Sequence, residues 1–198
     1  MPRFSRRTKI IITFVAIILC GYAVVKLTQG KGGVPQDFTD ARLQGAIIAQ
    51  NIVNLSNQST DNLAQVNTLD EKKDYAGALA LTASLVTQSQ QIRDQAVALS
   101  AQVGAMTKAL SGITDFSARQ AALESISSRL ALINQLINYS GDLGKLMDLL
   151  RSRFSGTTGT GPEVQALVNQ INTDVNAINN FNSQAGQAMD RFDNIVKK

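Results

Sequence analysis

Apolar residues recur at steps of three and four along four stretches of the chain, and this spacing is typical of helices that bury one face. The repeat is most regular in the last stretch and weakest at the start of the second. It predicts helices over about 35–69, 72–111, 115–153 and 162–197. The positions expected to face a core are Phe38, Ala41, Gly45, Ile48, Ile52, Leu55, Val66 and Leu69, then Tyr75, Ala78, Leu85, Ile92, Ala96, Leu99, Val103, Met106 and Leu110, then Leu123, Ile126, Leu130, Ile133, Ile137, Leu143, Met147, Leu150 and Phe154, and finally Val164, Val168, Ile171, Val175, Ile178, Asn182, Ala185, Met189, Phe192 and Val196.

Residues that end and start helices separate these stretches. Asp70–Asp74 is a charged turn whose aspartates can cap a helix. Gly112 can stop the second helix, and Thr114 or Asp115 can start the third. The longest break, 155–161, is followed by Pro162, in the first-turn position that proline tolerates.

The N-terminal segment is the most apolar part of the chain. Residues 10–25 are apolar except for Thr13, and lysines flank them. A helix over these residues is about 24 Å long, and Leu27 together with snorkelling lysines extends it towards the roughly 30 Å hydrocarbon core of a bilayer. We therefore predict a transmembrane signal-anchor helix over 10–27 that inserts into the lipid bilayer, between a basic cytoplasmic tail over 1–9 and a linker over 28–36.

Basic residues gather before this segment, which places the N-terminus inside and the C-terminus outside a single-pass protein of the cytoplasmic membrane. Two other fates stay open. Cleavage after Ala23 would fit the small residues at Gly21 and Ala23, and lipidation at Cys20 would need a small residue where the chain has Leu19. The anchor, together with the lack of cysteine pairs, leads us to expect a bacterial source.

Long helices joined by short loops favour an all-α, antiparallel up-down-up-down four-helix bundle with coiled-coil-like packing. We expect residues 37–198 to form this bundle outside the membrane. Its first helix starts at the membrane, so the loops at 70–74 and 155–161 should lie at the distal end.

The basic isoelectric point, about 9.4, misleads if it is read as a property of the whole chain. Six of the 19 Lys and Arg residues lie before residue 34, where there is no acid, and the remaining 13 face 15 Asp and Glu. Nucleic-acid binding needs a basic patch on the folded domain. We therefore expect no nucleic-acid partner.

Composition also excludes several kinds of chemistry. The chain has no His and one Cys. Catalytic triads that use His as the base are therefore excluded, and so are zinc sites built from several Cys and His ligands. No phosphate-binding glycine motif is present, and a di-metal carboxylate site in a bundle would use Glu-x-x-His. We expect neither an enzyme, nor a cofactor, nor a metal site.

Polar residues interrupt the apolar faces at similar heights, about two-thirds of the way up the bundle. A polar layer here would fix the register of the helices, and a small-ligand pocket is the alternative. A run of asparagines in the last helix is either a solvated shoulder or a surface for another helix or a sugar; it consists of Asn169, Asn172, Asn176 and Asn179, with Asn180 and Asn182. The residues of the layer or pocket are Ser59, Asn62, Ser89, Tyr139 and Ser140.

These features predict a structural or protein-interaction module of the cell envelope, whose partner is another envelope protein or a second copy. Its helix surfaces or its distal loop, with Ser155, Thr157, Thr158 and Thr160, would make the contact. The alternative is a ligand-binding or sensory bundle that signals through a membrane partner. In outline, such a bundle resembles the ligand-binding domains of chemoreceptors and sensor kinases.

Overall fold

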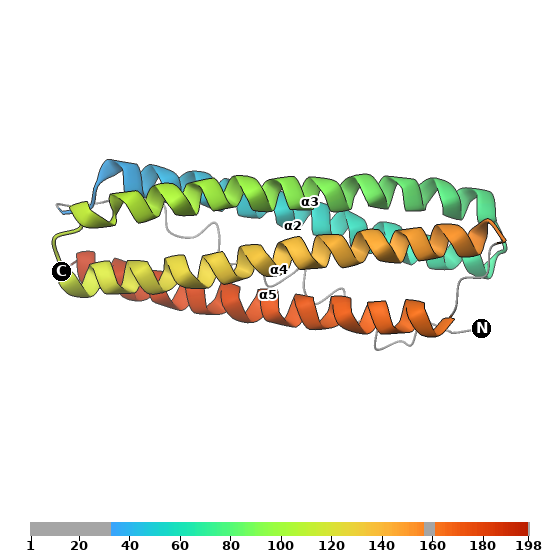
Figure 1. Cartoon of the computed structure of the whole chain (residues 1–198). Coiled ribbons are helices and arrows are strands. Elements are labelled where there is room, and N and C mark those ends of the chain that lie inside the picture. Colours follow the sequence, from blue (N-terminus) through green and yellow to red (C-terminus); the bar gives the residue numbers. More distant parts are fainter. Residues whose placement is uncertain (1–32, 157–160, 198) are drawn as a thin grey trace.

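The computed structural model describes residues 33–156 and 161–197, and within these ranges the chain is all-helical. Four long helices lie side by side and run alternately up and down (Figure 1). The predicted four-helix, all-α arrangement is therefore confirmed. The helices are α2 (Gln36–Glu71), α3 (Tyr75–Ala109), α4 (Phe116–Phe154) and α5 (Gly161–Val196), with a short 3-10 helix, η1 (Leu110–Gly112), between α3 and α4.

The predicted anchor over 10–27, with the tail before it, lies outside the residues that the structure describes. None of the helices that are described is both long enough and apolar enough to cross a membrane.

Aspartate caps set the starts of α3 and α4. The Asp74 carboxylate accepts a hydrogen bond from the Gly77 N–H at 3.0 Å, and that of Asp115 accepts one from the Ala118 N–H at 2.8 Å. Each bond satisfies a backbone donor that has no partner within the helix. The second helix begins three residues later than we predicted, because Lys73 adopts a φ of 60° and breaks the helical path before Asp74.

Each helix buries one stripe of side chains, and together the stripes form a single elongated core. Leu85, Ile92 and Leu99 of α3 are almost completely shielded from solvent, and all of the predicted apolar positions of α5 from Val164 to Ile178 are buried. Each such aliphatic side chain contributes about 1.5–3 kcal/mol to folding relative to an exposed one. The apolar repeat is thus the main source of stability.

Two positions that we predicted to be in the core of the third helix are wrong. Leu123 is 53% exposed and Leu130 is 45% exposed. A seven-residue repeat drifts by about 20° per heptad around a straight helix, and these leucines lie on its flank. Alanines and Ser125 take the inner positions at this end of α4.

The first and last helices are the least closely joined neighbours in the bundle. α2 packs along α3, α3 along α4 and α4 along α5, whereas α2 and α5 lack an extended approach of their Cα atoms within 8 Å. They are clamped at one end. There, the rings of Phe38 and Phe192 lie 5.3 Å apart, and Arg42 donates two hydrogen bonds, of 2.6 and 2.8 Å, to the Asp193 carboxylate. We call these four residues the α2–α5 clamp.

The row of α5 residues that runs back from Asp193 contains no apolar side chain. Seven-residue steps back from Asp193 give Gly186, Asn179, Asn172 and Gln165, none of which is apolar. At the end away from the clamp, α2 is joined to α4 instead, through an ion pair of 2.8 Å between Arg153 and Asp70.

Phe192→Ala should destabilise the bundle by about 3–5 kcal/mol, because it leaves a cavity at the clamp and unpairs the Phe38 ring. Phe116→Ala is the matched control, since Phe116 is 69% exposed. Denaturant unfolding followed by circular dichroism measures both. Equal midpoints for the two variants would contradict the importance of the clamp.

Candidate functional site

Two residues of the predicted polar layer meet on the α2–α3 side of the bundle. The Ser59 hydroxyl and the Asn62 amide nitrogen each lie 3.2 Å from the side-chain oxygen of Gln88, on α3. Ser59 is completely buried and its hydroxyl also lies 2.9 Å from the Leu55 carbonyl oxygen. Gln88, which the sequence analysis did not single out, thus links α3 to α2 at this height.

Two further residues of the layer meet on the α3–α4 side. The Ser140 hydroxyl donates to the Ser89 carbonyl oxygen at 2.9 Å, and the Ser89 hydroxyl donates to the Val86 carbonyl oxygen at 2.8 Å. Both serines are buried. Each polar group in this contact has a partner, which is what a buried register-fixing contact requires.

Tyr139 lies next to Ser140 but points in a different direction, because adjacent residues of a helix are about 100° apart. Burial raises the pKa of the Tyr139 phenol to about 12. Within the described residues no hydrogen bond joins the Ser59–Asn62 group to the Ser89–Ser140 pair. Four of the five residues therefore lie in two separate helix–helix contacts, Tyr139 is buried in the core, and the role of the five as a layer or as a pocket stays a prediction.

A pair of carboxylates joins α4 and α5 at a similar height. Asp174 is only 3% exposed, and Gln170 donates a hydrogen bond of 3.1 Å to one of its oxygens, while the other is buried and receives no hydrogen bond from a donor among the described residues. Asp142 lies close to it and accepts a hydrogen bond of 2.7 Å from Lys145. Burial raises the pKa of Asp174, and the neighbouring charge of Asp142 raises it further.

This pKa shift predicts how stability depends on pH. Above the ordinary carboxyl pKa of about 4, the folded chain holds a proton on Asp174 that the unfolded chain has lost. The free energy of unfolding therefore falls as the pH rises from there through the raised pKa. At neutral pH, Asp174→Asn should melt at a higher temperature than the parent and should show a flatter pH profile.

The matched control is Asp148→Asn, since Asp148 is an exposed residue of α4. Thermal unfolding at a series of pH values from 4 to 8 makes the comparison. A lower melting temperature for Asp174→Asn at neutral pH, or an unchanged slope, would show that the carboxylate is favourably paired.

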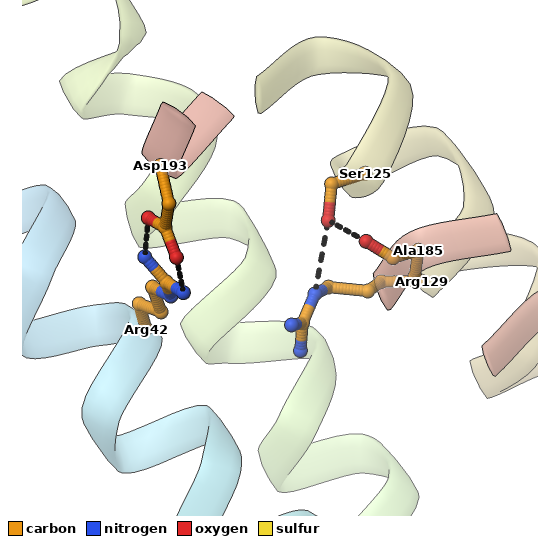
Figure 2. A network of polar contacts seen from close by, with 5 residues as sticks. All are labelled: Arg42, Ser125, Arg129, Ala185 and Asp193. Atoms are coloured by element: carbon orange, nitrogen blue, oxygen red, sulfur yellow. Dashed lines mark hydrogen bonds and ion pairs between the residues drawn. The ribbon is translucent and has the colours of Figure 1, made fainter. Parts of the chain in front are cut away.

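A second group of polar residues lies nearer to the clamp (Figure 2). The Ser125 hydroxyl donates to the Ala185 carbonyl oxygen at 3.0 Å, which ties α4 to α5, and it lies 3.4 Å from the Arg129 Nε. Burial, together with the nearby charge of Arg42, lowers the pKa of Arg129 to about 10. Arg129 lies four residues after Ser125 and four residues before Ile133, both of which are buried. It therefore belongs to the face of α4 that is turned towards the core.

Part of the asparagine run is buried rather than solvated. The side-chain oxygens of Asn172 and Asn179 on α5, and of Asn57 on α2, are shielded from solvent and have no hydrogen-bond partner among the described residues. Asn172 and Asn179 belong to the row of α5 residues that runs back from Asp193. Buried hydrogen-bond acceptors without a partner are uncommon. These asparagine oxygens are therefore available to a hydrogen-bond donor.

Most of the predicted distal loop lies outside the described residues, including Thr157, Thr158 and Thr160. Ser155 is described, and it is an exposed residue that ends α4 with its N–H bonded to the Arg151 carbonyl oxygen at 3.0 Å. Within the described ranges no three His, Cys, Asp or Glu side chains gather as metal ligands would.

Comparisons with protein-family models, with curated proteins and with solved structures found no match to this chain. Its function must therefore be argued from its own residues. We did not predict the polar contacts of Gln88, Asp142, Asp174 or Arg129 from the sequence. A charged residue within an apolar repeat is nevertheless a signal of such a contact that the sequence contains.

Proposed function

We propose that this chain is a membrane-anchored protein whose four-helix bundle serves as a structural or protein-interaction module outside the cytoplasmic membrane. The predicted helix over 10–27 holds it in the bilayer, with the N-terminus inside and the C-terminus outside. Its partner is another envelope protein or a second copy of the chain.

One observation carries this proposal, an exposed apolar row on α4. Phe116, Leu123 and Leu130 follow one another at seven-residue steps and are 69%, 53% and 45% exposed. Seven residues are close to two helical turns, so the three side chains share one face. Apolar side chains spaced in this way on a helix surface are typical of a face that packs against another helix.

The row continues onto α3 through Val97, which is 57% exposed. The hydrogen bond between Ser140 and Ser89 sets the register of α3 against α4. From that point, Val97 is eight residues along α3 and Leu130 is ten residues back along α4, so the two lie level to within about 3 Å. An apolar surface spanning two helices marks a protein contact better than one exposed side chain does.

A ligand-binding or sensory bundle that signals through a membrane partner is the second candidate. The buried side-chain oxygens of Asn57, Asn172 and Asn179, which have no partner, favour it. A small molecule that raises the melting temperature without any protein partner would support this candidate over the first.

The double substitution Leu123→Glu and Leu130→Glu should abolish association without unfolding the bundle, because both side chains are already half-exposed. Ile47→Glu on α2 is the control, since Ile47 is 48% exposed away from the row. Cross-linking in native membranes, followed by purification and identification of the attached proteins, measures association. An identical set of cross-linked proteins for the parent and the double variant would contradict the proposed surface.

Retention of the N-terminal helix is a separate expectation of the proposal. The intact mass of the protein purified from membranes should include residues 1–32, which hold the predicted anchor. A mature N-terminus at residue 24 would show cleavage after Ala23, and an acylated N-terminal Cys20 would show lipidation; either result rules out the anchor.

A further inference from the structure

Arg129 points into the bundle, and within the described part of the chain it makes a single hydrogen bond (Figure 2). Its Nε has one contact, at 3.4 Å, with the Ser125 hydroxyl, which itself donates to the Ala185 carbonyl oxygen. None of the ion pairs found among the described residues includes the Arg129 guanidinium. Its two terminal nitrogens are therefore left without an acidic partner.

The Asp193 carboxylate does not offer one. Both oxygens of Asp193 are occupied by Arg42, at 2.6 and 2.8 Å. Arg42 adds a second positive charge near Arg129, and its repulsion and the burial lower the pKa of Arg129, though only to about 10. At neutral pH the three side chains carry two positive charges and one negative charge, so this part of the interior has an excess positive charge.

A partly buried charge without a partner is costly, and replacing it by an apolar residue is commonly favourable. An anion would offset the cost. We propose that the Arg129 guanidinium anchors a site for a small oxyanion, a carboxylate or a phosphate, inside the bundle near the α2–α5 clamp. The planar guanidinium presents two N–H groups side by side, which match two oxygens of such an anion.

Arg129 is half-buried, so part of the residue remains in contact with solvent. The backbones of α2 and α5, which lie beside it, are the neighbouring pair without an extended close approach. This site is separate from the exposed row of α4, and its test does not depend on a protein partner.

Thermal unfolding of the full-length protein tests the proposal with acetate, inorganic phosphate and chloride in turn, at one ionic strength and pH 7.5. Arg129→Met removes the charge while keeping the length of the side chain. Arg93→Met, at an exposed position of α3, is the matched control. Calorimetric titration with the more effective oxyanion then gives the affinity of each variant.

The melting temperatures of the parent and of Arg93→Met should rise with acetate or phosphate above their values in chloride. Arg129→Met should melt higher than the parent in chloride, should not respond to oxyanions, and should bind at least tenfold more weakly. The more effective anion identifies the ligand as a carboxylate or a phosphate. An equal response of all three proteins would show a general salt effect, and a parent that responds to neither oxyanion, with Arg129→Met less stable, would show a purely structural arginine; both results overturn the proposal.

Discussion

The closure of the first helix against the last is the constraint on which the rest of this bundle depends. Consecutive helices are joined by short connections or by a long shared face, but α2 and α5 meet only through side chains. The clamp of Phe38, Arg42, Phe192 and Asp193 supplies this closure at one end. Once it has formed, the apolar stripes of the four helices face inward together and the polar contacts fall into register.

The buried polar contacts are distributed among the pairs of neighbouring helices and do not form a single cluster. Gln88 links α3 to α2, Ser140 links α4 to α3, and Ser125 links α4 to α5, each through a hydrogen bond of 2.9–3.2 Å. Such contacts fix the register at little net gain in stability. Arg129, whose one hydrogen bond among the described residues is with Ser125, lies near the clamp, and the buried side-chain oxygens of Asn172 and Asn179 have no hydrogen-bond partner within the described part of the chain.

The sequence was a good guide to whatever follows from helical periodicity. It predicted four helices within a few residues of their bounds, and an aspartate cap for one of them, because capping and apolar spacing are local properties; for the next helix it left Thr114 and Asp115 open, and Asp115 is the cap. It misjudged Tyr75, Leu123 and Leu130, which are exposed, since the orientation of a helix about its own axis depends on its neighbours. Counting along each helix predicted how high Ser59, Ser89 and Ser140 lie in the bundle, but not which residues they form hydrogen bonds with. Gln88, Asp174 and Arg129 escaped notice because their burial depends on side chains from other helices.

Distances between spin labels test the central claim, that α2 and α5 are held mainly at one end. In a Cys20→Ser background, labels at Thr39 and Asn194 span the clamp, and labels at Gln65 and Asn169 span the same two helices near the other end. All four positions are exposed, and Asp148 with Asn169 provides a reference across α4 and α5. Pulsed electron resonance should give narrow distance distributions for the clamp pair and the reference pair, and a clearly broader one for Gln65 and Asn169. A distribution for Gln65 and Asn169 as narrow as that of the reference pair would contradict the account.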